Sequence, residues 1–168
     1  GGGKSASSHA VATSLGHTIT QLAPSLFTFH IRDERLDGLP GLSVPEVAVS
    51  CQDARLEQSG PILITHWGLS GPAILKLSAW GAREFAQRDY RFEITINWTG
   101  SLKLSQAIAT LTESKRTNGA KQIGTLIPFS IPRRLWERLV QYAKIPQRTQ
   151  YSQISNIQLQ ALAETCVA

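Results

Sequence analysis

The stretch that decides the fold is THWGLSGPAIL, at residues 65–75. It continues an apolar run that begins at Ile62 and is typical of a buried strand. Beyond a glycine-rich turn, apolar residues recur at helical spacing until about Gln87. Ser70 is a preferred N-cap, and Pro72 suits the first helical turn because its missing N–H has no intrahelical partner there. The stretch therefore predicts a strand, a tight turn and a capped helix.

Segments with the period of a β-strand lie on both sides of this stretch. Upstream, short alternating or apolar segments separated by turn residues occur at 17–22, 25–32, 47–52, 54–58 and 62–65. Downstream, 90–98 alternates regularly, with one side formed by Tyr90, Phe92, Ile94 and Ile96. Short strands at close spacing are typical of antiparallel sheets and small barrels. We therefore expect an α+β fold: a β-rich antiparallel sheet or small barrel with one inserted helix, followed by a small all-helical subdomain.

The residues after 100 change from strand to helix and from neutral to basic. Helical spacing covers 105–113, 131–145 and 155–166. Two stripes are expected to face inward, formed by Leu135, Leu139, Tyr142 and Ile145 and by Ile157, Leu159, Leu162 and Ala163. Residues 101–168 hold nine Lys/Arg against three Asp/Glu, whereas residues 1–100 hold eight against nine. A basic half favours an acidic partner, an anionic ligand or nucleic acid.

These changes divide the chain into successive parts. We expect a lead-in or linker at 1–16, flexible over its first eight residues and ending in a short helix closed by Gly16. A β-rich subdomain follows at 17–100 and a basic helical subdomain at 101–150. A return segment with the C-terminal helix occupies 151–168. The core is the expected place for Trp67, Trp80, Trp98 and Trp136.

The composition is that of an ordinary globular protein, with 42% hydrophobic and 17% charged residues. No apolar run approaches the roughly 20 residues that span a bilayer, and no signal peptide is visible, so we expect no membrane partner. Cys51 and Cys166 fit no metal or disulfide spacing, which predicts two reduced, buried thiols in a cytoplasmic protein. The chain contains no methionine, so we expect a fragment of a longer protein.

The turn within 65–75 is the main candidate for a binding site. A helix N-terminus offers free N–H groups and attracts anions. In the functional interpretation, His66 donates or titrates while the amides of Gly71 and Ala73 hold an anionic or carbonyl oxygen. In the structural interpretation, His66 is an ordinary hydrogen-bonded histidine and Ser70 is only a cap.

Three other motifs also have a structural alternative. A hydrolase nucleophile elbow requires Gly-x-Ser-x-Gly, and Gly71 follows Ser70 one position too early. Residues 1–5, GGGKS, resemble the end of a phosphate loop but lack its spacing and preceding strand, so a tag or linker remnant is the alternative. The arginines of 131–140 suit phosphate groups, or else they are solvated or snorkelling beside a core stripe. No recognised nucleic-acid motif accompanies them.

Several stretches resemble one family of bacterial flavoproteins. THWGLSGPAILKLS (65–78) is similar to the family's FTHFGLSGPAIL signature. Weaker similarities occur in the same order in GGKS (2–5), LGHTITQLAPSL (15–26), GLSVPEVAVS (41–50) and IPRRLWERLV (131–140). The chain thus resembles the insert domain of the BaiN-type, or aminoacetone-oxidase-type, FAD-dependent oxidoreductases. It departs from the family in lacking the Tyr-Pro…Thr-Gly-Ser-Thr-Gly-Asp-Gly run that normally follows the GGKS element.

The resemblance implies a cofactor, a partner and a site. In that family both ends of the chain build a Rossmann domain that binds FAD, and a β-rich and helical insert lies between them. This chain would be a cap that shapes the substrate pocket and is not catalytic alone. FAD, with NAD(P)H as an optional second cofactor, would belong to the parent enzyme and none to this chain.

The resemblance also names the site residues, with no catalytic residue and no metal ligand among them. Those expected to face the substrate and flavin are His66, Trp67, Gly68, Ser70, Gly71 and Pro72, and those expected to touch the cofactor are Gly2 and Gly3. The residues leave one alternative of another class open. In that alternative the chain is a stand-alone interaction module whose basic helical half binds an acidic partner or nucleic acid.

Overall fold

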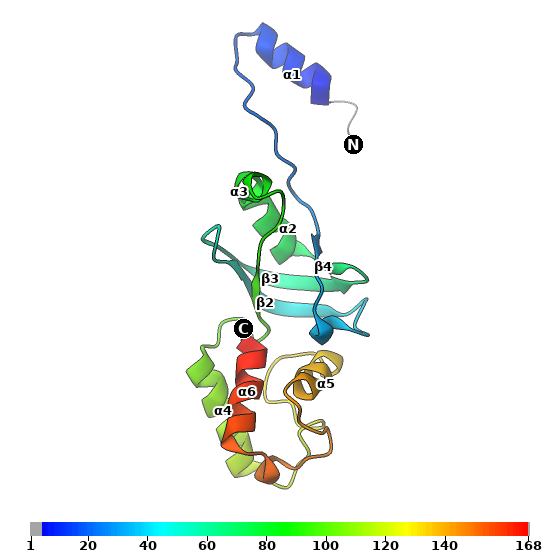
Figure 1. Cartoon of the computed structure of the whole chain (residues 1–168), viewed down its shortest axis with the longest axis vertical. Coiled ribbons are helices and arrows are strands. Elements are labelled where there is room, and N and C mark those ends of the chain that lie inside the picture. The colour runs from blue at the N-terminus through cyan, green and yellow to red at the C-terminus, as the bar shows by residue number, and fades with distance from the viewer. Residues whose placement is uncertain (1–4, 168) are drawn as a thin grey trace.

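The structure of the protein is a computed structural model, which describes residues 5–167. Its strands are β1 (Phe29–His30), β2 (Ser43–Cys51), β3 (Leu56–Thr65), β4 (Gly68–Ser70) and β5 (Thr95–Asn97). Its helices are α1 (Ser5–Ser14), α2 (Pro72–Trp80), α3 (Ala82–Gln87), α4 (Leu104–Thr117), α5 (Arg133–Tyr142) and α6 (Asn156–Val167), with 3-10 turns η1 (Glu34–Leu36) and η2 (Tyr151–Gln153). The sheet lies between α2 and α3 on one side and α4, α5 and α6 on the other (Figure 1).

The five-stranded sheet is antiparallel throughout, in the order β1-β4-β3-β2-β5. It is open at β1 and β5 and therefore forms half a barrel. The register of β2 against β3 shifts between Val44 and Val47, around Pro45, which has no N–H for the ladder. This bulge leaves both valines on the buried side. The predicted α+β fold, with an antiparallel sheet followed by a helical region, is confirmed.

Several strands differ from those that the alternation predicts. No strand forms at 17–22, where every residue is exposed, so that prediction was wrong. Only β1 within the predicted 25–32, and only β5 within the predicted 90–98, pair with a neighbour. Conversely, the predicted segments 54–58 and 62–65 both fall on the single strand β3, except for residues 54–55, which belong to the turn before it. Alternation shows which side of a segment faces the core, but a strand also needs a partner about 4.8 Å away.

The helix predicted after the turn is divided into α2 and α3. The two meet at Gly81, where a Cβ atom would overlap the ring of Phe85, so glycine lets that buried ring pack against the junction. The expected cap is not formed by Ser70, which is the last residue of β4. The N-cap is Gly71, which makes no side-chain hydrogen bond, and Pro72 is the first helical residue as predicted.

Helices α4, α5 and α6 form the predicted helical region. Most of the expected inward positions are buried, namely Leu135, Leu139, Ile145, Leu159, Leu162 and Ala163. Two are not. Tyr142 is 46% exposed and its ring lies 5.7 Å from the guanidinium of Arg35. Ile157 is 82% exposed, because two residues before Leu159 is about 200° round the helix from the buried stripe.

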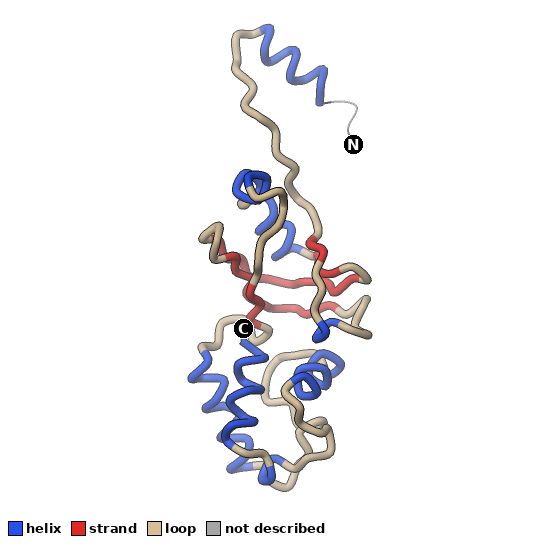
Figure 2. The backbone as a smooth tube through the Cα atoms, in the orientation of Figure 1, coloured by secondary structure: helices blue, strands red, loops and turns tan. Residues whose placement is uncertain are grey.

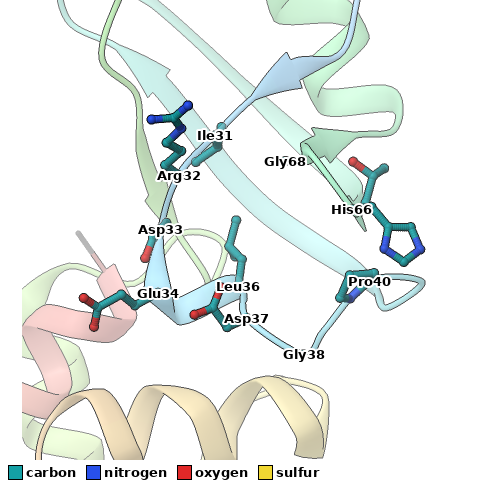
Figure 3. A pocket seen from close by; sticks show the side chains of 11 residues that line it. Ile31, Arg32, Asp33, Glu34, Leu36, Asp37, Gly38, Pro40, His66 and Gly68 are labelled. Atoms are coloured by element: carbon teal, nitrogen blue, oxygen red, sulfur yellow. The ribbon is translucent and has the colours of Figure 1, made fainter.

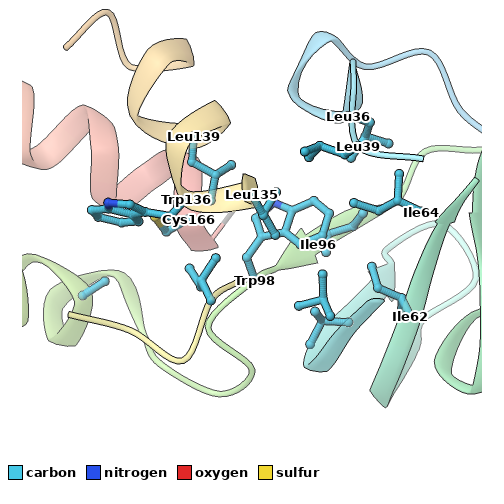
Figure 4. Close-up of a cluster of buried hydrophobic side chains, with 14 of the residues drawn as sticks. Leu36, Leu39, Ile62, Ile64, Ile96, Trp98, Leu135, Trp136, Leu139 and Cys166 are labelled. Atoms are coloured by element: carbon cyan, nitrogen blue, oxygen red, sulfur yellow. The ribbon is translucent and has the colours of Figure 1, made fainter. Parts of the chain in front are cut away.

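Trp98 joins the sheet to the helical region. It follows β5, is completely buried, and its backbone N–H donates to the carbonyl of Cys166 in α6 at 2.9 Å. Its ring lies among side chains from both regions, including Ile96 and Leu135 (Figure 4). One hydrophobic cluster therefore runs through both regions. Trp136 is buried as well, whereas Trp67 and Trp80 are 63% and 72% exposed, contrary to the expected core placement.

The arginines of α5 hold the helical region against the loop that follows β1. Arg134 donates to the carbonyl of Gly38 at 2.6 Å, and Arg138 donates to that of Glu34 at 2.5 Å. Arg133 instead pairs with Glu137 on its own helix, at 2.9 Å. All three guanidinium groups thus have partners within the chain. Arg133 and Arg134 are exposed and Arg138 is half-buried, which agrees with the expected alternative of solvated or snorkelling arginines.

Helix α1 stands away from the sheet and the other helices, at the end of an extended segment (Figure 2). Residues 5–8 belong to this helix, so the expected flexible lead-in is wrong for them. The helix ends just before Gly16, as expected, and Gly16 has a positive φ of 85°. Within the described chain, none of the helices combines the length and the apolar character that crossing a membrane requires.

Both cysteines are buried free thiols, as expected. We expect the burial of Cys166 and of the neighbouring Tyr151 to lower the free energy of unfolding above about pH 8.5. Burial raises the pKa of the Cys166 thiol to about 12, and burial together with Cys166 raises the pKa of the Tyr151 phenol. An unfolded cysteine ionises near pH ~8.5, so between that pH and 12 the unfolded state loses a proton that the folded state keeps, and rising pH favours unfolding.

Circular-dichroism melts between pH 7 and 11 measure this effect. Replacement of Cys166 by alanine should make the dependence on pH shallower, because one of the two buried acids is then absent. A melting temperature that stays constant over this range contradicts the prediction.

Candidate functional site

The signature residues form the tip of a hairpin and the start of α2. Strands β3 and β4 pair with Thr65 opposite Gly68, which leaves His66 and Trp67 as the connecting turn. Both side chains are exposed, and their rings lie 6.1 Å apart. The turn therefore presents an imidazole and an indole at the end of the sheet.

Both glycines of the signature are required by the fold itself. At Gly68, φ is 148° and a Cβ atom would overlap the carbonyl oxygen of Phe29 in β1. At Gly71, φ is 100° and a Cβ atom would lie 2.9 Å from the Cα of Ile62 in β3. The close approach that these glycines permit here is that of the chain's own backbone. Their proposed contact with a flavin stays a prediction.

The start of α2 offers little access to an anion. Pro72 has no N–H, and Ala73 is completely buried. The N–H of Leu75 already donates to the carbonyl of Gly71 at 2.9 Å. The predicted role of the Gly71 and Ala73 amides therefore depends on a ligand that reaches a largely covered helix end.

A cavity of about 440 Å³ adjoins the hairpin (Figure 3). The hairpin contributes Thr65, His66 and Gly68, and loop residues between 31 and 40 supply the rest of the wall. The cavity therefore takes in two of the predicted site residues and leaves out Trp67, Ser70, Gly71 and Pro72. Figure 3 shows His66 next to Pro40 on one side of the cavity, with Arg32 and Glu34 on the opposite side.

The loop that lines this cavity is rich in charge and is not among the predicted site residues. Two of its three carboxylates already face cations: Asp33 pairs with Arg35 at 2.8 Å, and Asp37 lies 3.9 Å from Arg138. The buried hydroxyl of Thr65 has no hydrogen-bond partner among the described residues. The sequence feature that could have indicated this loop as part of a site is its cluster of acidic residues beside glycine and proline.

The hydrolase interpretation of Ser70 finds no supporting geometry. Ser70 ends β4, whereas His66 lies in the turn before that strand. Between residues 5 and 167, no hydrogen bond joins the two side chains, and no group of three His, Cys, Asp or Glu side chains is placed to hold a metal ion. The chain therefore shows neither a serine–histidine pair nor a metal centre in its described part.

A second candidate surface lies in the helical region, where two loops run side by side. Ile123 donates its N–H to the carbonyl of Thr149 at 2.9 Å, and Tyr151 donates to that of Lys121 at 3.0 Å. Lys121 and Arg148, on these two loops, are exposed and form no ion pair with the described residues. We call these two cations and their loops the basic loop pair.

The described residues do not fit an FAD cofactor. A dinucleotide site needs a parallel βαβ unit with a glycine-rich turn before the helix. Every strand pair here is antiparallel, and the sequence contains no G-x-G-x-x-G. Gly2 and Gly3, to which the resemblance gives a cofactor contact, lie outside the described residues.

Comparison with known proteins agrees with the resemblance drawn from the signature. The family profile described as "HI0933-like protein barrel and H2TH domain" matches residues 23–167. The ribosomal RNA dihydrouridine synthase of Escherichia coli (strain K12) is 31% identical over 114 residues, which cover 67% of this chain and 25% of that enzyme. The chain thus spans about a quarter of the curated relative it matches. The chain belongs to the HI0933-like flavoprotein family, as its barrel and H2TH domain.

Proposed function

We propose that this chain is the substrate-binding cap of an FAD-dependent enzyme that reduces uridine bases in RNA. The observation that carries the proposal is the 31% identity to a ribosomal RNA dihydrouridine synthase. The basic character of residues 101–168 supports it, since RNA carries one negative charge per nucleotide. Other parts of the parent enzyme would hold the FAD and supply the reducing chemistry, so this chain alone is not catalytic.

The two candidate surfaces would have separate tasks. The basic loop pair would neutralise phosphates of the RNA, because Lys121 and Arg148 are exposed cations that pair with no acidic group between residues 5 and 167. The turn of His66 and Trp67 would face the flavin and the base that reacts, because both rings are exposed at the end of the sheet. Phosphate contacts position a nucleic acid, while contacts to the bases select it.

We expect the chain to bind ribosomal RNA fragments with an affinity that falls steeply as salt is added. Each phosphate contact to a single strand contributes about 0.7 to the slope of log K against log salt, so Lys121→Glu with Arg148→Glu should reduce the slope by about 1.4. Fluorescence anisotropy with a labelled RNA, at several salt concentrations, measures this slope.

The matched control is Arg55→Glu with Lys76→Glu, which makes the same change in charge at exposed positions of the barrel region. It should leave the slope close to that of the unchanged chain. An equal reduction of the slope in both double variants would show that RNA binding depends only on the overall charge of the chain. Absence of RNA binding even at low salt would contradict the proposed function.

A further inference from the structure

The half-barrel has an open seam between its edge strand β1 and the segment 90–94. The two run side by side, since the ring of Phe27 lies 5.6 Å from that of Tyr90 and the ring of Phe29 lies 5.1 Å from that of Phe92. No backbone hydrogen bond of the described residues joins them. A groove of about 290 Å³ follows this seam, lined by residues 27–31 and by Tyr90, Phe92 and Ile94.

The walls of the groove are aromatic and accessible. Tyr90 is 42% exposed, and Phe27 and Phe92 are half-buried. The rings of Phe92 and Phe85 are stacked, with centroids 3.9 Å apart, so Phe92 has a fixed orientation. The groove thus presents flat apolar faces that the rest of the fold holds in place.

The same groove also has free hydrogen-bonding groups along one side. Ile31 donates its N–H to the carbonyl of Trp67 at 2.9 Å, and Phe29 stands opposite Leu69 in β4. In an antiparallel ladder, alternate residues direct their N–H and C=O groups to opposite sides. The backbone groups of Thr28 therefore point away from β4 and into the seam, and those of His30 do the same.

We propose that this seam binds an unstacked nucleobase of the RNA substrate. A nucleobase has a flat apolar face, which suits the rings of Tyr90 and Phe92, and a polar edge, which suits the free backbone groups of β1. The groove is lined on both sides and admits a single splayed base, whereas bases inside a duplex cannot enter it. This assignment rests on the proposed function and names the part of the RNA that the barrel region recognises.

Charge at the groove favours a nucleotide over an uncharged aromatic ligand. Arg32 and Arg91 do not line the groove, but each is next in sequence to a residue that does, and both are exposed and without an ion pair to the described residues. They suit the phosphates on either side of a bound base, although Glu93 on the same segment offsets part of this charge.

The test compares an RNA hairpin that has an unpaired pyrimidine loop with a fully paired RNA duplex. Tyr90→Ala should weaken binding of the hairpin by about five- to a hundredfold, which is the usual effect of losing one base–aromatic stack, and should leave duplex binding unchanged. Tyr90→Phe should retain most of the affinity because the ring face remains. Trp80→Ala removes an exposed aromatic side chain that lies outside the groove and should behave like the unchanged chain.

A second measurement needs no substitution. In an NMR titration with uridine 5′-monophosphate, the amide signals of Thr28 and His30 should shift together with the ring signals of Tyr90. Equal hairpin affinity of Tyr90→Ala and the unchanged chain, with no such shifts, overturns the seam assignment while RNA binding by the chain stands. Equal losses for hairpin and duplex overturn it too. If the unchanged chain binds no RNA, the proposed function fails, and the seam assignment fails with it.

Discussion

Trp98→Ala is expected to lower the free energy of unfolding by about 3–5 kcal/mol, the usual effect of removing a large aromatic side chain from a core. Trp98 is completely buried where the sheet meets α6. Its indole N–H has no hydrogen-bond partner in the described chain, so the ring contributes through packing alone. Domains of this size are usually stable by about 5–15 kcal/mol, so the loss takes away a large part of the total. Urea denaturation followed by circular dichroism measures it.

The control for this variant is Trp80→Ala. Trp80 is 72% exposed, and substitutions at such positions usually change stability by less than about 0.5 kcal/mol. Trp98→Phe should recover part of the loss, since most of the apolar volume returns. A Trp98→Ala chain as stable as the Trp80→Ala chain would mean that the sheet and the helical region do not share one core.

The elements that could be predicted from the sequence are those specified by neighbouring residues. Strand β3 and helix α2 follow directly from the change of period within 65–75, and Pro72 marks where the helix begins. The stripe of Leu135 and Leu139 identifies the buried face of α5 for the same reason. In each case the information is local, because helical and strand periods are set by the backbone itself.

The elements that could not be predicted depend on partners far away in the chain. Residues 17–22 alternate like a strand but meet no neighbouring strand, and all remain exposed. Residues 90–94 alternate too, yet they lie beside β1 without hydrogen bonds to it. Trp67 and Trp98 are both tryptophans, and only the tertiary structure decides that Trp67 is exposed and Trp98 is buried.

The candidate sites divide in the same way. The sequence identified His66 and the signature turn, but not the charged loop that faces them across the cavity. It identified a basic half, but it placed the emphasis on the arginines of α5, which the fold uses to bind backbone carbonyls. Lys121 and Arg148 become neighbours only because two loops pair, a contact with no counterpart in the local sequence pattern.

The signature at 65–75 combines residues that the fold requires with residues that are exposed and available for binding. The substitution Gly68→Ala tests the requirement of the fold. A residue with a side chain at φ 148° is strained, and its Cβ would overlap the backbone of Phe29. Strain of this kind costs about 1–3 kcal/mol and overpacking a further 1–3 kcal/mol, so we expect a loss of about 2–6 kcal/mol in the free energy of unfolding. Chemical denaturation at neutral pH measures this loss.

Gly60→Ala is the matched control, because Gly60 has a similar φ of 134° but open space where a Cβ would lie. Gly60→Ala should show only the loss of stability that comes from backbone strain. The difference in the free energy of unfolding between the two variants then measures the steric cost of the close contact between β1 and β4. Because Gly68→Ala must push β1 away from β4, it should also disturb the seam and weaken binding of hairpin RNA, while Gly60→Ala should not. Equal losses of stability in the two variants would mean that β1 yields freely, and a seam built on so mobile an edge could not hold a base in one orientation.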